Sequence, residues 1–251
     1  VDLPQNGSVN FAGASPTEAA AFAVFRDFLT PDTLYALEDG AAHARTVRAL
    51  PAQFDSAPYI TEQYEAVSSD GVRVPYFVVR RRDMPFNGDN PTLLWAYGGF
   101  QLSYPPFYSG FVGRMWLAHG GVYVIANIRG GGEFGPAWHQ AGLRTNRQII
   151  FDDFYAVQRD LVERGVTSPR RLGIMGGSQG GLFMGAMLTQ RPDLINAAVI
   201  QVPLFDMLRF HKFTFGAFWV SDYGDPDKAG DFAVLRRYSP LHNVGRGAKY
   251  P

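Results

Sequence analysis

The stretch Leu172-Gly173-Ile174-Met175-Gly176-Gly177-Ser178-Gln179-Gly180 decides the fold of this 251-residue chain. Its first four residues form a short apolar run, which predicts a buried strand, and we expect a helix to begin near Gly180. A G-x-S-x-G sequence that leaves a strand and enters a helix places its serine on a tight elbow with the hydroxyl exposed. Glycines at 176 and 180 let the backbone fold closely there, because side chains would collide. Ser178 is therefore a candidate nucleophile.

The motif alone is a weak signal, because the chain contains 28 glycines and short motifs arise by chance. The alternative interpretation is a glycine-rich turn between strand and helix that only needs tight packing. The expected strand and helix favour the nucleophile. The N-terminus of that helix would also favour negative charge that develops beside Ser178.

Four short, wholly apolar runs are typical of strands in a sheet that is covered on both faces. They are residues 92–96, 122–126, 172–175 and 197–202. Helical patterns lie between them at residues 110–119, 151–164 and 182–190. Two further strands, 63–67 and 72–79, flank the hairpin signal Ser69-Asp70-Gly71. An antiparallel start followed by alternating strands and helices predicts an α/β domain with a mostly parallel sheet, of the α/β-hydrolase type.

The second helical pattern has apolar residues that we expect on one face, with acidic residues in its first turn and Gly165 just past its end. The expected face consists of Phe151, Phe154, Tyr155, Leu161 and Val162, and the acidic residues are Asp152 and Asp153.

Residues 1–55 differ from the rest of the chain. Phe22–Phe25 and Thr33–Leu37 are short β-prone fragments separated by the turn signals Thr30-Pro31-Asp32 and Glu38-Asp39-Gly40. Two or three strands cannot bury both of their faces alone. We expect this segment to belong to a larger β structure or to pack on its neighbour.

Composition excludes several classes of function. Lys plus Arg (23) balances Asp plus Glu (23), so no strong field attracts nucleic acid or an anionic membrane. The chain has no cysteine, which excludes disulfides, thiolate metal sites and a cysteine nucleophile. No apolar run reaches 18 residues, and the N-terminus has neither a signal peptide nor a starting Met. We expect a processed or excised piece of a cytoplasmic protein, with a periplasmic location as the alternative.

Tyr97-Gly98-Gly99-Phe100 follows the first buried strand, where an α/β hydrolase keeps the second donor of its oxyanion hole. The first donor would be the backbone N–H of Gln179, and the Tyr97 hydroxyl could be the second. Such donors contribute about 3–4 kcal/mol each when they point at the oxyanion. The alternative is a turn with a core tyrosine.

Gly130, Gly132 and Gly135 satisfy G-x-G-x-x-G after a strand, which raises dinucleotide binding as an alternative. The context fits poorly, because Pro136-Ala137-Trp138-His139 follows and no strand-end acid lies about 20 residues further on. We therefore expect no nucleotide and no metal cofactor.

The sequence offers no clear general base. A hydrolase of this type needs an acid and a histidine after its serine, and only His211 and His242 follow Ser178. Neither has an acid before it at the end of a predicted strand. We interpret both as structural residues.

From about residue 55 onward the chain resembles the catalytic domain of the prolyl oligopeptidases, the S9 serine peptidases. The matching blocks are residues 97–100, 126–133, 176–181, 206–213 and 238–244. Residues 1–55 resemble the last blade of the β-propeller of that family, including Phe28-Leu29-Thr30-Pro31. The resemblance implies a propeller segment at 1–55 and a catalytic domain at 56–251.

The resemblance also implies roles for individual residues. Ser178 would attack the carbonyl after proline in short peptides and form an acyl-enzyme, with Tyr97 and the Gln179 N–H as the oxyanion hole. Trp219 would stack on the proline ring, between walls formed by Phe100, Leu204 and Tyr223. A flat indole suits a rigid apolar ring that has no N–H to satisfy. Each of these aromatic and aliphatic side chains could instead be ordinary core.

Three residues depart from the family pattern. Gln179 stands where the family more often has Asn, Leu204 where a smaller Val is common, and Val157 where Ala is usual. The first two could change the size of the proline pocket. Asp222 is the acid close enough in sequence to Trp219 to question proline specificity.

The resemblance places the catalytic Asp and His, the Arg that binds the substrate backbone and the last strands of the sheet beyond Pro251. Most of the propeller would precede Val1. The expected protein is a monomer that acts on short proline-containing peptides. Two alternatives stay open: a non-catalytic piece that needs another segment to supply Asp and His, and a related S9 peptidase that prefers another residue at the cleavage site.

Overall fold

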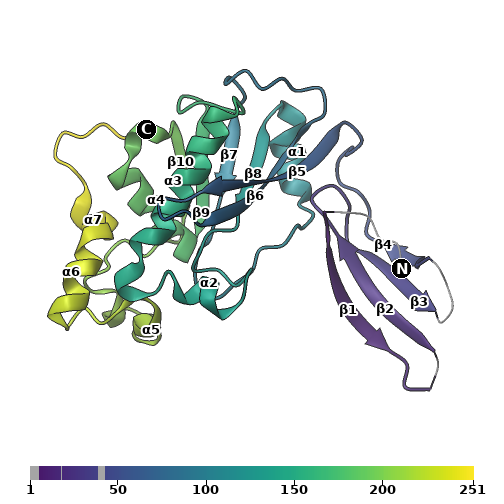
Figure 1. Cartoon of the computed structure of the whole chain (residues 1–251), viewed down its shortest axis with the longest axis horizontal. Helices are drawn as coiled ribbons and strands as arrows, with labels where there is room; N and C mark the ends of the chain where they lie inside the picture. The colour runs from purple at the N-terminus through teal and green to yellow at the C-terminus, as the bar shows by residue number, and fades with distance from the viewer. Residues whose placement is uncertain (1–5, 18, 39–42) are drawn as a thin grey trace. The chain divides into compact units, whose positions relative to one another are not determined.

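The computed structural model describes residues 6–17, 19–38 and 43–251, which fall into two compact units (Figure 1). The first unit takes in Val1–Glu62, Val79–Met84 and Tyr104–Gly121. The second unit takes in Gln63–Val78, Pro85–Ser103 and Val122–Pro251. Every residue that the sequence singled out for chemistry belongs to the second unit.

The first unit contains a four-stranded antiparallel sheet in the order β1-β2-β3-β4. Its strands are β1 (Ser8–Ala14), β2 (Ala20–Arg26), β3 (Thr33–Glu38) and β4 (Arg45–Ala49). The two β-prone fragments of the sequence are confirmed as β2 and β3, which supply the buried side chains Ala23, Phe25 and Ala36. The sequence analysis did not predict β1 and β4, whose residues are largely exposed.

A six-stranded sheet, most of it in the second unit, has the order β10-β9-β7-β8-β6-β5. Its strands are β5 (Tyr59–Val67), β6 (Arg73–Arg81), β7 (Thr92–Trp95), β8 (Val122–Ala126), β9 (Leu172–Gly177) and β10 (Ala197–Gln201). Strand β7 pairs in parallel with both β8 and β9, and β9 pairs in parallel with β10. The predicted hairpin and the four apolar strands are confirmed.

Burial at both faces, which we predicted for all four apolar strands, is wrong for β10. Its residues alternate between exposed and half-buried, and Val199 keeps 46% of its surface exposed. Strand β10 lies at the end of the sheet order and has only β9 beside it among the described strands. An apolar run therefore predicted the strand correctly but not its position at the edge.

Helices and short 3₁₀ turns connect the strands. The α-helices are α1 (Gly110–Met115), α2 (Pro136–Gln140), α3 (Gln148–Glu163), α4 (Gln179–Gln190), α5 (Val220–Tyr223), α6 (Ala229–Tyr238) and α7 (Pro240–Asn243). The 3₁₀ turns are Leu117–His119, Arg144–Asn146, Pro192–Leu194, Phe210–Lys212 and Gly216–Trp219. None of the described helices is long and apolar enough to cross a membrane.

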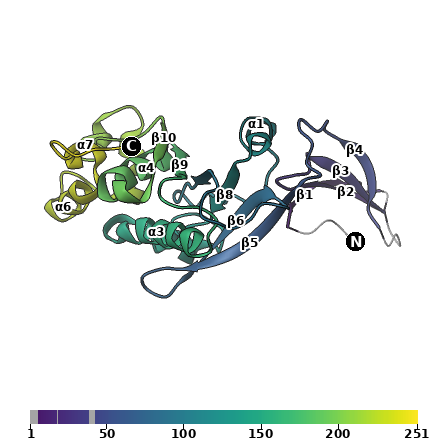
Figure 2. The same cartoon turned by 90° about the horizontal axis from the view of Figure 1, so that it is seen from above.

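Helices α3 and α4 lie side by side in Figure 1 and in Figure 2, with the Phe151 and Phe183 rings stacked at 5.3 Å between centroids. Helix α3 begins three residues before the predicted start, so Asp152 and Asp153 lie in its second turn and not in the first. The predicted apolar face is correct for Phe151 but wrong for Val162, which is 38% exposed. Because α3 begins earlier, Asp153 lies further inside the helix, and its side chain is buried in the core.

Asp153 is fully buried and binds Arg129, which follows β8. The Arg129 guanidinium also donates to Asp70 in the hairpin between β5 and β6, with Nη1 2.6 Å from Oδ2. Ser68 donates to Asp153 at 2.6 Å. This cluster joins the end of β8, helix α3 and the hairpin, and so fixes the loops that follow the parallel strands.

Candidate active site

Ser178 occupies a sharp turn between β9 and α4, as the sequence predicts. Its backbone has φ 57° and ψ −116°, a conformation that a non-glycine residue rarely adopts, and its N–H donates to the Gln201 carbonyl at 3.0 Å. A Cβ at Gly176 would come within 2.6 Å of the Gly180 carbonyl oxygen, and one at Gly180 within 2.9 Å of the Ala96 carbonyl oxygen. Strain of this kind gathers at functional sites.

Tyr97 follows β7 and hydrogen-bonds the Ser178 side chain. Burial raises the pKa of the Tyr97 phenol, so it stays protonated and can donate, while the bond to Ser178 and the charge of Arg147 act in the opposite direction. Gln179 is the first residue of α4, and its backbone N–H has no acceptor within the helix. The structure thus brings both predicted oxyanion donors to Ser178.

The Gln179 side chain makes contacts that the sequence did not predict. It is 1% exposed, accepts a hydrogen bond from the Tyr223 hydroxyl at 2.5 Å and donates to the Gly98 carbonyl at 3.3 Å. Each contact joins segments more than 40 residues apart, so no local pattern could have indicated it. Gln179 connects the elbow, the Tyr97 loop and α5.

A cavity of about 180 Å³ lies beside Ser178. This volume is below the about 300–1,000 Å³ of pockets for drug-sized ligands, and it suits a single small ring. The lining residues are Tyr97, Phe100, Leu102, Ser178, Leu204, Trp219 and Tyr223. All four predicted wall residues are therefore brought together.

The aromatic walls of this cavity contact one another edge to face. The Phe100 ring lies 5.8 Å from the Tyr223 ring at 84° and 6.5 Å from the Trp219 ring at 68° between planes. Such packing stabilises each ring through its quadrupole. Phe100 has φ 54°, so the loop that presents it is itself in a rarely populated conformation.

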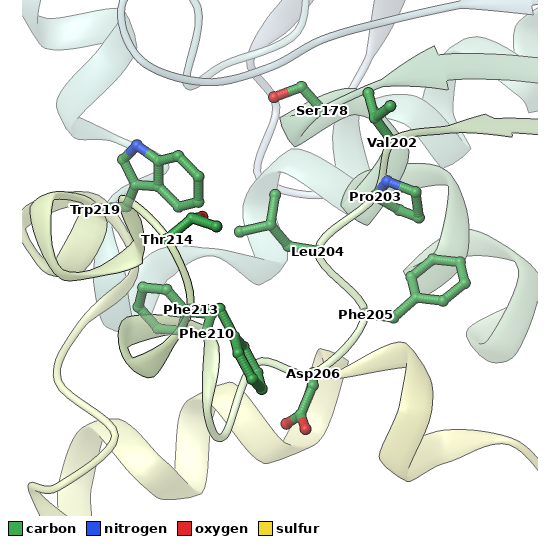
Figure 3. A pocket seen from close by; sticks show the side chains of 10 residues that line it. All are labelled: Ser178, Val202, Pro203, Leu204, Phe205, Asp206, Phe210, Phe213, Thr214 and Trp219. Carbon is green, nitrogen blue, oxygen red and sulfur yellow. The ribbon is translucent and has the colours of Figure 1, made fainter.

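A second, larger cavity of about 480 Å³ shares Ser178, Leu204 and Trp219 with the first (Figure 3). It continues along the segment after β10 and is mostly apolar, with further walls from Pro203, Phe205, Phe210 and Phe213. Figure 3 places Leu204 between Trp219 and Pro203, and this side chain lines both cavities.

Asp222 is not among the residues that line the smaller cavity, although its charge acts on Tyr97 and Tyr223, which do. Its Oδ1 lies 3.6 Å from Nε2 of His139, and its side chain is 13% exposed. Nδ1 of the same imidazole lies 2.8 Å from the Gly130 carbonyl and 3.1 Å from the Gln101 N–H, so the tautomer decides which of the two it bonds. The acid that questioned proline specificity thus lies beside a histidine and is not among the residues that line the smaller cavity.

The two histidines that follow Ser178 lie beside acids, although neither ring nitrogen of His211 makes a hydrogen bond to another described residue. His211 Nε2 lies 3.4 Å from Asp227, and His242 Nδ1 lies 2.8 Å from the Ser239 hydroxyl with Nε2 4.0 Å from Asp206. Both geometries fit the structural interpretation that the sequence favoured.

The G-x-G-x-x-G segment packs against the Phe100 loop. A Cβ at Gly132 would come within 2.1 Å of the Gln101 carbonyl oxygen, and the Gly130 N–H donates to the Trp138 carbonyl at 3.0 Å. The segment leads into α2, a helix of five residues, whereas a dinucleotide site places its pyrophosphate on a long helix.

The strand–elbow–helix turn, the mostly parallel sheet and the Tyr97 loop together define an α/β-hydrolase domain. The family model described as "Prolyl oligopeptidase family" (Peptidase S9) matches residues 109–251. The chain belongs to the prolyl oligopeptidase family, whose solved members combine a β-propeller with an α/β-hydrolase domain.

Individual relatives cover this chain almost completely. An uncharacterized peptidase of Sinorhizobium fredii is 49% identical over 99% of the chain and 34% of its own length. A prolyl endopeptidase of Elizabethkingia meningoseptica is 37% identical over 100% of the chain and 36% of its own length. The solved structure of a post-proline cleaving enzyme from Rickettsia typhi matches with a TM-score of 0.92 and 42% identity, over 100% of the chain and 36% of that enzyme. The chain thus spans about a third of the length of these relatives.

Proposed function

We propose that this chain supplies the nucleophile and the oxyanion hole of a serine peptidase that cleaves short peptides on the carboxyl side of proline. The observation that carries the proposal is the small cavity beside Ser178, walled by Trp219, Phe100 and Tyr223. The printed names of relatives, prolyl endopeptidase and post-proline cleaving enzyme, support the same substrate class.

In the proposed mechanism, a general base of the full-length protein takes the proton of the Ser178 hydroxyl as its oxygen attacks the carbonyl carbon of proline, and the same group then passes this proton to the leaving nitrogen. The attack forms a tetrahedral intermediate. Its oxyanion accepts hydrogen bonds from the Tyr97 hydroxyl and the Gln179 N–H. Collapse of the intermediate expels the amine of the next residue and leaves an acyl-enzyme, which water hydrolyses. Because the elbow already exposes the Ser178 side chain, no change of backbone conformation is needed to present it to the substrate.

The proline ring would lie in the cavity against the Trp219 indole. Each methylene of an apolar ring in such a pocket contributes about 1–3 kcal/mol to discrimination between substrates. Proline has no N–H, so the apolar walls leave no donor unpaired. Leu204 would close the cavity on the side away from Phe100.

We also propose the division of the chain. Residues 1–55 form the end of the propeller domain, and residues 56–251 belong to the catalytic domain. The antiparallel sheet of β1 to β4 supports the first assignment, and the Ser178 elbow supports the second.

The test compares the full-length protein with Gly-Pro-arylamide and Arg-arylamide substrates. We expect hydrolysis of the proline substrate to dominate and to disappear in Ser178→Ala. A preference for the arginine substrate would contradict proline specificity and favour a related S9 peptidase. Activity that survives Ser178→Ala would contradict the proposed nucleophile.

A second candidate is a piece that is inactive until another segment supplies an acid and a base. The approach of His211 to Asp227 and the hydrogen bond between His242 and Ser239 favour it. A fluorophosphonate that labels activated serines distinguishes the two cases. Slow labelling of residues 1–251 and fast labelling of the full-length protein would support the need for another segment, whereas equally fast labelling would contradict it.

A further inference from the structure

Arg147 is a buried cation close to the candidate oxyanion hole. It lies at the start of α3, is 1% exposed, and holds its guanidinium carbon 4.6 Å from the centre of the Tyr223 ring. Nη1 donates a long hydrogen bond, 3.5 Å, to the Gly142 carbonyl, and Nη2 is buried without a partner among the described residues. The sequence did not indicate Arg147, because a charge before a helix usually faces solvent.

A charge in this position is costly. Removing a guanidinium from water costs several kcal/mol, and the usual remedy is a carboxylate within ion-pair distance. Of the ion pairs found in the described part of the chain, none includes Arg147, in contrast to Arg129 with its two aspartates. Contact with the Tyr223 ring recovers only part of this cost. The remaining cost is accounted for if the positive charge of Arg147 stabilises another group of the site.

Three phenols lie near enough to Arg147 to be affected by its charge, and two of them belong to the candidate site. Its charge acts on Tyr97, Tyr223 and Tyr238, and in each case it opposes the rise in pKa that burial causes. Tyr97 is the phenol that hydrogen-bonds Ser178, and Tyr223 is the phenol that bonds Gln179. A fixed positive charge in a dry region makes a phenol a stronger donor and stabilises a neighbouring oxyanion.

We propose that Arg147 is a positioning residue of the oxyanion hole. Its guanidinium, packed on the Tyr223 ring, holds the Tyr223–Gln179 pair in place and supplies a fixed positive potential behind the Tyr97 hydroxyl. The anion that it favours is the oxyanion of the tetrahedral intermediate. This inference rests on the proposed function, in which Tyr97 donates to that oxyanion.

The experiment is a double-mutant cycle in the full-length protein. Arg147→Met and Arg147→Gln remove the charge, Arg147→Lys keeps it, and Tyr97→Phe removes the phenol. We expect the neutral variants to lower kcat for Gly-Pro-arylamide by about 10- to 100-fold with a small change in KM, since the charge acts on the transition state. Arg147→Lys should retain activity within about fivefold, because it keeps the cation but loses the stacked plane.

The decisive comparison is made in the Tyr97→Phe background. There we expect the neutral Arg147 variants to lower kcat by a clearly smaller factor than in the parent background, because the phenol on which the charge acts is gone and only the contact with Tyr223 and Gln179 is left to lose. The same loss of kcat in both backgrounds would overturn the inference, since a purely structural role would be additive. Unchanged kcat in both neutral variants would overturn it as well.

Arg171→Met is the matched control, because Arg171 is an exposed arginine paired with Asp89. We expect it to leave kcat unchanged. Normal activity of Tyr97→Phe would overturn the proposed oxyanion hole and the Arg147 inference with it. A large loss of kcat in Tyr97→Phe, together with unchanged kcat in the neutral Arg147 variants, would overturn the Arg147 inference alone. Two neutral variants keep the test valid if one of them fails to fold.

Discussion

The Tyr223 hydroxyl donates a hydrogen bond of 2.5 Å to Oε1 of Gln179, the residue that follows the candidate nucleophile. One side chain thereby joins a wall of the smaller cavity to the residue whose backbone N–H would bind the oxyanion. The second bond of Gln179, from Nε2 to the Gly98 carbonyl, extends the connection to the Tyr97 loop. In the proposed mechanism, substrate recognition and transition-state binding would therefore depend on one buried amide.

Gln179→Leu should lower kcat/KM for Gly-Pro-arylamide about 10-fold or more. The substitution keeps the volume but leaves the Tyr223 hydroxyl and the Gly98 carbonyl unpaired, and each buried unpaired group costs about 1–3 kcal/mol. Gln148→Leu, at an exposed glutamine of α3 that bonds Asp152, should leave kcat/KM unchanged. Equal kinetics of Gln179→Leu and the parent protein would show that the amide does not position the site.

Trp219→Ala should lower kcat/KM for Gly-Pro-arylamide by about 10- to 200-fold, the range for losing apolar contacts in a specificity pocket. Phe218 is the control, because it is the preceding residue in the chain and is 79% exposed. Phe218→Ala should change kcat/KM less than about twofold. Full activity of Trp219→Ala toward proline would contradict the assignment of the indole as the surface on which the ring stacks.

Local pattern predicted the parts of the site that lie on regular elements. The elbow could be predicted because a short apolar run, two glycines and a helix stand in immediate succession around Ser178. The Gln179–Tyr223 bond and the burial of Arg147 could not, because both depend on how α5 and the start of α3 pack after the chain has folded. For the cavity walls, a resemblance to known proteins supplied Trp219 and Leu204, which periodicity alone would have assigned to the core.

Gly176→Ala should destabilise the protein by about 1–3 kcal/mol, the usual cost of overpacking, because its Cβ would overlap the Gly180 carbonyl oxygen at 2.6 Å. The neighbouring Gly177 gives a matched control. A Cβ there would meet Gln201 at an ordinary 3.5 Å, so Gly177→Ala should change the free energy of unfolding by less than about 0.5 kcal/mol. Urea denaturation measures both, and equal effects of the two variants would contradict the close approach.

Arg129→Met should cost about 3–5 kcal/mol of stability, because it leaves the fully buried Asp153 carboxylate without a countercharge. Arg73→Met, which breaks an exposed pair with Glu65, should cost less than about 1 kcal/mol. Urea denaturation at neutral pH compares them. Similar free energies of unfolding for the two variants would mean that the Arg129 cluster does not hold the hairpin and α3 together.

The same cluster predicts a dependence of stability on pH. The hydrogen bond from Arg129 holds the pKa of the Asp70 carboxyl below its ordinary value of 3.8, although burial opposes it. A carboxyl whose pKa is lower in the folded protein contributes stability above the pKa of the unfolded chain, and this contribution is lost as the pH falls through the folded pKa. Asp70→Asn should therefore lower the free energy of unfolding at pH 7 and make less difference below about pH 3. Because the Asp70 side chain is 38% exposed, we expect an effect well below that of Arg129→Met. A difference between Asp70→Asn and the parent protein that stays constant from pH 7 to pH 3 would contradict the role of the ionised carboxylate.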